Sequence, residues 1–391
     1  MISFDLWDTL IARRSISDIY NEENNCFPIA ENVAKVKADS VIISDYYDAG
    51  LAQRLVKEVL GLDNQVVVSS QGKANGYMFE QFKHLNHTDH YGDNEHSDVR
   101  MANQHGIRGH YTAPSPFTAL EGLVDGKGLR GLSRVMRETR LTTFNQKYRN
   151  LELLQTQLNF PMLFVGSLLL HRTQPERLLM CARDCCLWQH LQAKVRDLCG
   201  GKYEIVYFRT SRLACAFPKT GYWDYVKSLM PGTIVDLAAS GKTLLKIREA
   251  TGIQMPLAIL MQYDNGVPAS DIIRLTDITL RVEFVEFMNL DRSPLYLSHE
   301  ENENPINVDW NRPEIAIQHE TFMKCLEAMK HYDLTADLNI SDSVLLDTFR
   351  MLYENVTRYT IQIGNPYDWA YGWFEQEHQD TMRRLNAHNK E

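Results

Sequence analysis

Short apolar runs alternate with helix-like stretches through the first hundred or so residues. Between the runs, Ala49–Leu60 and Tyr77–Leu85 carry apolar residues at helical spacing, with Gly and Asn at the joints. The runs themselves predict strands, at Ile2–Phe4, Val41–Ile43, Val66–Val68 and a short segment closing on Gly92-Asp93. Strands that alternate with helices form a parallel sheet with right-handed crossovers. The pattern therefore predicts a Rossmann-like domain that ends near Tyr111.

The pattern changes twice further along the chain. Over residues 113–175 Leu, Arg and Gln dominate and the apolar positions fit helices, which indicates a helical bridge. Strand signals then return, at Arg177–Cys181, Tyr203–Phe208, Thr233–Val235, Leu257–Met261 and Leu280–Phe287, and the pattern is helical again from Asp309 onward. We therefore expect an α/β domain over 1–112, a bridge over 113–175, a second α/β domain over 176–308 and a helical region over 309–391.

Composition and charge narrow the class of protein. With 391 residues the chain is long enough for two or three domains with their own cores. The net charge of −9 argues against non-specific binding of nucleic acid. The longest apolar stretch, Phe160–Leu170, is too short to cross a membrane, and no secretory pattern precedes the first strand. Seven cysteines without a CxxC pair are typical of reduced, structural thiols. We expect a cytoplasmic protein without a membrane partner, and a homo-oligomer stays open.

Side chains suited to phosphoryl transfer stand where the predicted strands end. Asp5 closes the first strand and can attack phosphorus in line, forming an aspartyl-phosphate. Thr9 follows where its hydroxyl and the loop amides can hold the transferring group. Ser44 ends the next strand and can donate its hydroxyl to a phosphoryl oxygen. Lys73, in the loop Ser69–Gly76, supplies positive charge against the negative charge of the transition state.

Two carboxylates follow the last strand of this domain. The segment Gly92-Asp93-Asn94-Glu95-His96-Ser97-Asp98 places Asp93 and Asp98 five residues apart on one turn. Hard oxygen ligands beside Asp5 suit Mg²⁺, which keeps several waters and bridges to phosphate. We therefore expect Mg²⁺ as the cofactor, bound by these three carboxylates.

These residues give the chain a resemblance to the haloacid dehalogenase (HAD) superfamily. The four motifs of that superfamily match Asp5 with Thr9, Ser44, Lys73, and Asp93 with Asp98, over about residues 1–112. More narrowly, Phe-Asp-Leu-Trp-Asp-Thr-Leu is similar to a predicted hydrolase group whose first motif reads FDIFDTL and whose members carry a long C-terminal extension. The resemblance implies an enzyme, a Mg²⁺-dependent phosphatase acting on a phosphorylated small molecule.

The chain departs from the superfamily in two ways. Phosphatases of the superfamily carry an acid two residues after the nucleophile, where this chain has Trp7, and the nearest acid is Asp8. Loss of a general acid costs roughly 10²–10⁴-fold in rate. Three alternatives stay open: Asp8 or a residue of the other domain supplies the proton, the leaving group needs no proton, or the site only binds phosphate. The backbone carbonyl of Trp7 is still available to the metal. In addition, the short insert before Ser44 implies a missing or minimal cap.

A second group of residues predicts phosphate binding in the second α/β domain. Thr233–Val235 leads into Asp236 and then Ser240-Gly241-Lys242-Thr243, a strand followed by a small-residue loop and a helix start, whose amides suit an anion. A P-loop needs glycine where Asp236 stands. The loop resembles that of type I phosphoribosyltransferases, with Asp236 on the second acidic position and Val235 on the first.

That resemblance implies a ligand such as phosphoribosyl pyrophosphate or a nucleotide. It would make Ser240, Gly241 and Thr243 the 5-phosphate loop and Arg183-Asp184 a pyrophosphate loop. Arg209, Arg212 and Lys242 would favour a polyanion. The alternative is a plain Rossmann-like domain in which Arg183 and Asp184 form a structural ion pair.

Two smaller signals are interpreted as structural. The histidines at three-residue spacing, His84, His87 and His90, are expected to be solvated or capping, because one helical turn followed by a strand would splay them. Cys181, Cys185 and Cys186 are expected to be small buried thiols at a strand end.

The preferred function is a Mg²⁺-dependent phosphohydrolase joined to a second domain that binds phosphate. Two alternatives stay open. One is a phosphoribosyltransferase whose HAD-like domain is auxiliary. The other is a catalytically silent ligand-binding or regulatory protein.

Overall fold

The protein divides into two compact units, each with one parallel sheet. Unit 1 comprises Met1–Leu123 and Ser133–Gln146, and unit 2 comprises Val124–Leu132 and Lys147–Glu391. The computed structural model describes residues 1–14, 25–69, 71–182, 184–263, 266–268, 270–280, 313–362 and 383. The four parts expected from the sequence are a finer division than these two units, and their boundaries stay a prediction.

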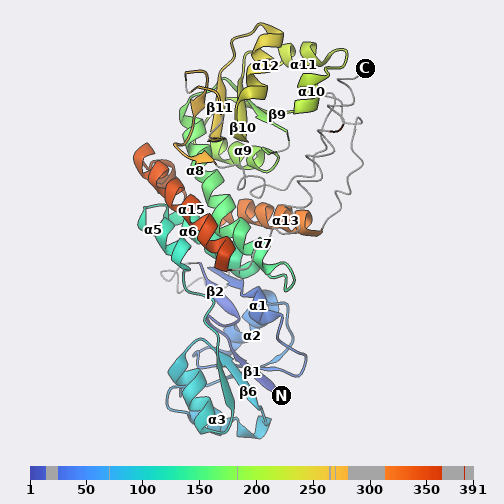
Figure 1. Ribbon diagram of the computed structural model, residues 1–391. Coiled ribbons are helices and arrows are strands. Elements are labelled where there is room, and N and C mark those ends of the chain that lie inside the picture. The colour runs from blue at the N-terminus through green and yellow to red at the C-terminus, as the bar shows by residue number, and fades with distance from the viewer. Residues whose placement is uncertain are drawn as a thin grey trace. The chain divides into compact units, whose positions relative to one another are not determined.

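Five parallel strands form the sheet of unit 1, and two of them, β1 and β6, are labelled in Figure 1. The strand order across the sheet is β5-β4-β1-β6-β7. The bounds are β1 (Ile2–Asp5), β4 (Val41–Ser44), β5 (Gln65–Val68), β6 (Asp89–Gly92) and β7 (Arg108–Tyr111). The chain thus builds outward on one side of β1 and then continues on the other side, a Rossmann-like order whose direction reverses at β1. The predicted α/β class is confirmed, and so are the four strands predicted in this domain.

The core of unit 1 explains why its central strands are continuous apolar runs. Parallel strands are buried on both faces, and Phe4, Leu6 and Ile42 are fully buried against Leu55 and Val56 of α2 (Ala49–Glu58). The carboxylate of Asp48 caps α2 by accepting a hydrogen bond from the amide of Leu51. The remaining helices are α1 (Ala30–Val33), α3 (Tyr77–Gln81), η2 (Lys83–Leu85), η3 (Glu95–Arg100) and α4 (Met101–Gln104), while α5 (Ala119–Gly126) and α6 (Arg130–Thr142) contribute to both units.

A small antiparallel ribbon occupies the insert between β1 and β4. It consists of β2 (Ile11–Arg13) and β3 (Cys26–Pro28), and with α1 it accounts for the described part of that insert. Phe27 of this ribbon is buried with Leu141 of α6. Arg14 forms a two-pronged ion pair with Glu138 of α6, at 2.8 and 2.9 Å. The described part of this insert is therefore packed against and paired with α6.

The sheet of unit 2 is also parallel. Its strand order is β12-β11-β10-β8-β9, with β13 pairing onto β11. The bounds are β8 (Arg177–Cys181), β9 (Glu204–Phe208), β10 (Thr233–Ala239), β11 (Leu257–Tyr263), β12 (Ile273–Arg274) and β13 (Thr279–Leu280). Direction reverses between β8 and β10, which makes the carboxyl ends of these two strands the place where such sheets bind ligands.

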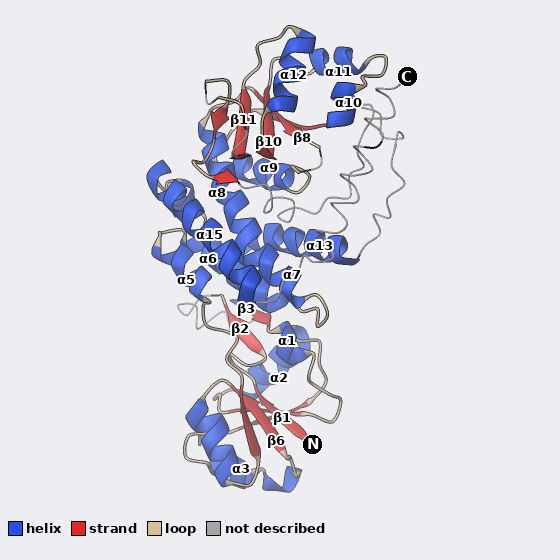
Figure 2. Cartoon of the chain, viewed as in Figure 1, coloured by secondary structure: helices blue, strands red, loops and turns tan. Residues whose placement is uncertain are grey.

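The other regular elements in the described part of unit 2 are helices (Figure 2). Their bounds are α7 (Arg149–Leu154), η4 (Gln155–Asn159), α8 (Phe160–Arg172), α9 (Trp188–Leu198), α10 (Arg212–Ala216), α11 (Tyr222–Ser228), α12 (Lys242–Thr251), α13 (Pro313–Ala328), η5 (Met329–His331), α14 (Thr335–Leu338) and α15 (Asp342–Gln362). The continuous helix Arg149–Arg172 is long and apolar enough to cross a membrane, yet 94% of its apolar window is buried inside the protein, as in a core helix.

Three elements differ from the sequence prediction. The edge strand β7 was not predicted, because Arg108–Tyr111 has no apolar run. Strand β10 runs to Ala239, four residues further than predicted from its first apolar run Thr233–Val235, so that Asp236 lies within the strand. The predicted strand Leu280–Phe287 begins at the end of β13, and its remainder lies outside the described residues.

Candidate functional site

The carboxyl ends of three neighbouring strands meet at the centre of the first sheet. Asp5 is the last residue of β1, Ser44 is the last residue of β4, and Asp93 directly follows β6. Strands β4 and β6 pair with β1 on its two sides, so these residues share one edge of the sheet. This is the point at which the strand order reverses, where open α/β sheets bind their ligands.

A buried lysine joins two of the carboxylates at this edge. The Nζ of Lys73 lies 2.6 Å from Oδ1 of Asp5 and 2.7 Å from Oδ1 of Asp98. Lys73 is only 3% exposed, Asp5 is 6% exposed and Asp98 is completely buried. The loop that carries Lys73 and the turn after β6 are thus brought together on β1, as the sequence order of the motifs predicted.

Each key residue of the turn after β6 has a structural role. Gly92 approaches Asp98 so closely that a Cβ at this position would lie 2.2 Å from the Cγ of Asp98. The side chain of Asn94 caps η3 by accepting hydrogen bonds from the amides of His96 and Ser97. The backbone amide of Asn94 donates to Oδ2 of Asp98 at 3.0 Å. Glycine and asparagine therefore fold the turn so that Asp98 reaches back to the sheet edge.

His90 is a site residue that the sequence interpretation missed. It lies on β6, is completely buried, and contacts Oδ1 of Asp98 through Nε2 at 3.3 Å and Oγ of Ser3 through Nδ1 at 2.9 Å. His87 is also buried, so the expectation of solvated or capping histidines is wrong for these two and holds for exposed His84. Strand periodicity is the signal that identifies His90, because it shares a face of β6 with Gly92.

Burial and charge shift the ionisation of the cluster. Burial raises the pKa of Asp5, and the charge of Lys73 offsets only part of this increase. Burial also raises the pKa of Asp93, with the negative charges of Asp8 and Asp98 adding to the effect. For Asp98, burial acts in the same direction, but the hydrogen bond from His90 and the charge of Lys73 outweigh it and lower the pKa. Burial is the largest cause of both raised pKa values, and neighbouring carboxylates add to it.

The donor set fits a hard divalent cation. One carboxylate oxygen from each of Asp5, Asp93 and Asp98 lies within 4.8 Å of the others, and this is the one group of potential ligands found in the described part of the chain. Among the described residues, Lys73 is the one lysine that contacts these carboxylates, through Asp5 and Asp98, so a bound cation would balance the remaining negative charge. Oxygen ligands of this kind suit Mg²⁺ rather than softer metals. The cluster is thus a candidate metal site.

The loop after Asp5 is tightly folded. The amides of Leu10 and Ile11 both donate to the carbonyl of Leu6, and Asp8 adopts φ +56°. A positive φ is rare outside glycine and asparagine, although aspartate tolerates it better than most residues. Thr9 is completely buried and its hydroxyl has no hydrogen-bond partner. The loop therefore holds an unsatisfied polar group four residues from Asp5, where the transferring group was predicted to bind.

Trp7 packs within an aromatic group beside this loop. The guanidinium of Arg13 lies 4.2 Å from the centre of the Trp7 ring, and the ring of Tyr46 lies 5.6 Å away on the loop after Ser44. Tyr46 also donates its amide hydrogen to Oγ of Ser44. Trp7, two residues after Asp5, is therefore an aromatic side chain held by its neighbours.

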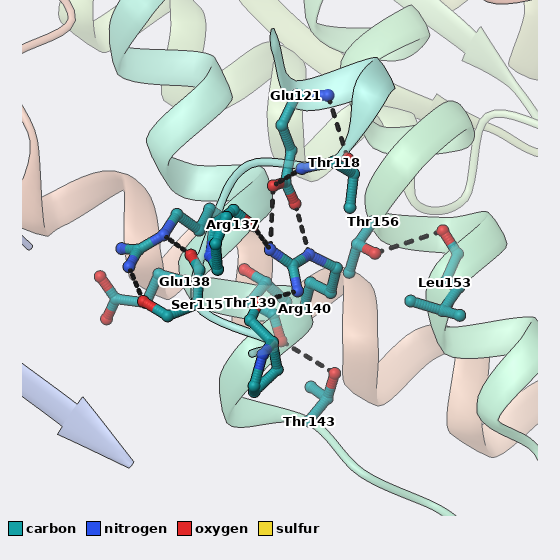
Figure 3. A network of polar contacts seen from close by, with 12 residues as sticks. Ser115, Thr118, Glu121, Arg137, Glu138, Thr139, Arg140, Thr143, Leu153 and Thr156 are labelled. Carbon is teal, nitrogen blue, oxygen red and sulfur yellow. Dashed lines mark hydrogen bonds and ion pairs between the residues drawn. The ribbon is translucent and has the colours of Figure 1, made fainter. Parts of the chain in front are cut away.

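Helix α6 is connected to Asp8 through Ser115. Oγ of Ser115 donates to Oδ1 of Asp8 at 2.6 Å. Arg137 of α6 donates to the Oγ and the carbonyl of Ser115 at 2.7 and 2.6 Å (Figure 3). One turn further along α6, Arg140 forms a buried two-pronged ion pair with Glu121 at 2.6 and 3.0 Å. This network fixes the Asp8 side chain in the loop that follows β1.

The second sheet brings some of the other predicted residues together. Asp184 follows β8, and the loop Ser240-Gly241 follows β10, its neighbour at the reversal of strand order. Gly241 has φ +82° and begins α12, whose first two residues are Lys242 and Thr243. Asp236 is half-buried within β10, so the expected position in the loop is wrong, because the strand extends past it.

The remaining predicted residues of this group are less defined. The amide of Arg209, at the end of β9, donates to the hydroxyl of Tyr225. Arg212 is the first residue of α10, although its side chain lies outside the described residues, as does the whole of Arg183. Cys181 and Cys185 are buried and burial raises the pKa of both thiols, which confirms the expectation of structural cysteines there.

Comparison with known proteins does not assign the chain. No model of a known protein family matches it, and no curated protein matches it. What the structure shows is an α/β protein with two parallel sheets and a buried aspartate cluster near the N-terminal strand that can serve as a metal site.

Proposed function

We propose that unit 1 is a Mg²⁺-dependent phosphohydrolase of the haloacid dehalogenase type. The proposal is carried by one observation, the buried contact of Lys73 with both Asp5 and Asp98 at the central sheet edge. Asp5 is held beside a fixed positive charge, and Asp93 lies in the same cluster. The substrate class is a phosphate monoester of a small molecule, in the cytoplasm, with neither membrane nor nucleic acid as a partner.

The chemistry follows from the position of Asp5. One oxygen of Asp5 attacks the phosphorus, the bond from phosphorus to the leaving oxygen breaks, and an aspartyl-phosphate forms. Water then attacks this phosphorus, which releases inorganic phosphate and regenerates the Asp5 carboxylate. Splitting the reaction in this way replaces one difficult displacement by two easier ones.

The neighbouring side chains hold the phosphoryl group. Lys73 neutralises charge that builds on the phosphoryl oxygens, and the hydroxyls of Ser44 and Thr9 are the nearby donors from β4 and the loop after Asp5. Asp5, Asp93 and Asp98, with the carbonyl of Trp7, would hold Mg²⁺. Bound Mg²⁺ would orient the phosphate and offset its negative charge.

The leaving oxygen needs a proton unless it is already a good leaving group. Trp7 cannot supply one, and Asp8 is the carboxylic acid next to it in the sequence. Asp8 is held through Ser115, which fixes where its carboxyl group lies. We therefore assign the proton-donating position to Asp8 and expect esters with good leaving groups to be the best substrates.

A phosphatase assay tests this proposal. The full chain is assayed with Mg²⁺ on a panel that includes aryl phosphates, sugar phosphates and nucleotides. We expect phosphate release that falls to background in Asp5→Asn and that needs Mg²⁺. The control is Asp63→Asn, because Asp63 is an exposed aspartate of the same unit with 88% of its side chain accessible. Its activity should equal that of the wild type.

The result also decides between an enzyme and a regulatory protein. If the wild type and Asp5→Asn release phosphate equally slowly across the panel, the phosphohydrolase proposal is wrong. A silent protein that only binds phosphorylated ligands would then be the better interpretation.

A second candidate function belongs to unit 2. It is favoured by the loops after β8 and β10, which lie at the reversal point of the second sheet, with the positive φ of Gly241 at the start of α12. We propose that this edge binds the phosphate groups of phosphoribosyl pyrophosphate or a nucleotide. Calorimetry with phosphoribosyl pyrophosphate should show binding that Asp236→Ala weakens. Absence of binding, or binding that Asp236→Ala leaves unchanged, would exclude the phosphoribosyltransferase-like function.

A further inference from the structure

A chain of buried polar contacts continues behind the candidate metal site. Ser3 of β1 contacts Nδ1 of His90 at 2.9 Å, and Nε2 of His90 contacts Oδ1 of Asp98 at 3.3 Å. Ser3, His90 and Asp98 are all completely buried. None of these contacts involves an exposed group, so the row of contacts from Ser3 to Asp98 lies entirely in the interior of the protein.

The donors and acceptors in this chain can be assigned from its ends. An ionised carboxylate only accepts hydrogen bonds, so Nε2 of His90 carries the hydrogen that points to Asp98. In the neutral ring Nδ1 then accepts, and the hydroxyl of Ser3 is its donor. The alternative acceptor for Ser3, the carbonyl of Asp89, is further away at 3.3 Å. Ser3 thus fixes the tautomer in which His90 donates to Asp98.

The contacts of Asp98 determine how much of it is left for a ligand. A carboxylate has about four lone-pair directions. Oδ1 receives Nζ of Lys73 and Nε2 of His90, while Oδ2 receives the amide of Asn94. Three directions are therefore occupied, and one direction on Oδ2 is left. The carboxylate is held rigidly with a single vacant acceptor position.

We propose that Ser3 and His90 are positioning residues that orient Asp98 for the divalent cation. This inference rests on the proposed function, because it needs Asp98 to be a metal ligand. Hydrogen bonds behind a ligand are a general requirement of metal sites, and their loss lowers metal affinity about 10–100-fold. Here the partner lies on β6 and the tautomer is set from β1, so the sheet itself fixes the ligand.

Neighbouring His87 provides a matched comparison. It precedes His90 by three residues, is 6% exposed, and has no hydrogen-bond partner on either ring nitrogen. A buried histidine in this region is thus compatible with a purely packing role. The two contacts of His90 separate it from that role and point to Asp98.

The experiment is a titration of the full, metal-free chain with Mg²⁺ in a calorimeter. We expect His90→Leu to weaken Mg²⁺ binding about 10–100-fold. His90→Gln keeps an N–H donor and should recover most of the affinity, and Ser3→Ala should show a smaller loss. The control His87→Leu should bind Mg²⁺ as the wild type does. Circular dichroism and thermal unfolding identify any variant that is not folded.

A spectroscopic measurement gives a readout that does not depend on the metal. Nitrogen-15 chemical shifts of the ring, assigned with His90→Gln, should show the tautomer with hydrogen on Nε2, and Ser3→Ala should shift the Nδ1 resonance. Hydrogen on Nδ1 instead would overturn the inference. Wild-type affinity for Mg²⁺ in folded His90→Leu would also overturn the inference. So would equal Mg²⁺ affinities of His90→Leu and His90→Gln, because the N–H donor would then have no effect.

The failure of the proposed function would look different. If the wild-type chain does not bind Mg²⁺ at all, both the metal site and this inference are overturned. If the wild type and His90→Leu bind Mg²⁺ equally, only the positioning role of His90 is overturned. If Mg²⁺ binding depends on His90 while the phosphatase panel shows no activity, the inference holds and the catalytic proposal fails.

Discussion

Replacing Lys73 by methionine removes the one cationic side chain in the described part of the protein that contacts both Asp5 and Asp98. The side chain is 3% exposed and its Nζ lies 2.6 and 2.7 Å from the two carboxylate oxygens. At an effective dielectric constant of about 20, each contact is worth about 6 kcal/mol in Coulomb energy. Burying the ammonium group costs several kcal/mol in return. The mutant also leaves two carboxylates facing each other, and proton uptake by one of them limits the damage.

Removing one partner of a buried ion pair costs about 3–5 kcal/mol, and we expect Lys73→Met to lose this much in free energy of unfolding. Urea unfolding at neutral pH with a chelator, followed by circular dichroism, measures the loss. The control is Lys57→Met, because Lys57 is 73% exposed and lies 3.6 Å from Asp63. An exposed pair of this kind contributes at most about 1 kcal/mol. Equal stability of Lys73→Met and Lys57→Met would refute the reasoning.

Three further predictions concern the same unit. Burial lowers the pKa of His87 to about 4, below its unfolded value near 6.5, so the wild type loses stability as pH falls through this window. By pH 5 this loss is about 2 kcal/mol, and urea unfolding of His87→Leu between pH 7 and 5 should lack it. Gly92→Ala places a methyl group 2.2 Å from Cγ of Asp98, which should cost about 1–3 kcal/mol in thermal unfolding and weaken Mg²⁺ binding, and an unchanged melting temperature would contradict the close contact. Ser115→Ala removes the donor to Asp8, so it should destabilise the chain by about 1–3 kcal/mol and slow phosphate release, whereas Ser115→Thr should retain both properties.

The strands that carry the candidate site were predictable because they are the most apolar segments of unit 1. Central parallel strands are buried on both faces, so β1 and β4 are apolar runs that end at a polar residue. The edge strand β7 has only one neighbouring strand, and its sequence Arg-Gly-His-Tyr contains no such run. Sequence pattern therefore indicates the centre of this sheet more clearly than its edge.

The candidate site was also predictable only in part. The sequence order of Asp5, Lys73 and Asp98 was sufficient to predict that they belong together, because Asp5 ends one strand of a parallel sheet and the other two follow strands of the same sheet. The contact of Lys73 with both carboxylates could not be predicted, since it depends on how the loop Ser69–Gly76 folds over β1. Ser3 and His90 were missed because their chemistry lies in a cross-strand contact between β1 and β6.

The acidic cluster bears on whether the site is a relic that has lost its function. Gathering buried Asp5 and Asp98 and half-buried Asp93 in one place is costly, as the raised pKa values of Asp5 and Asp93 indicate. Apolar side chains of similar size at such positions are often neutral or stabilising, so packing does not require these carboxylates. A bound cation would offset this cost. Under the proposed function, Trp7 supplies no proton to the leaving group, yet the negative charge that would hold a cation is intact. We infer that metal binding is the property for which this sheet edge is built, and that Trp7 restricts the leaving group and not the cation.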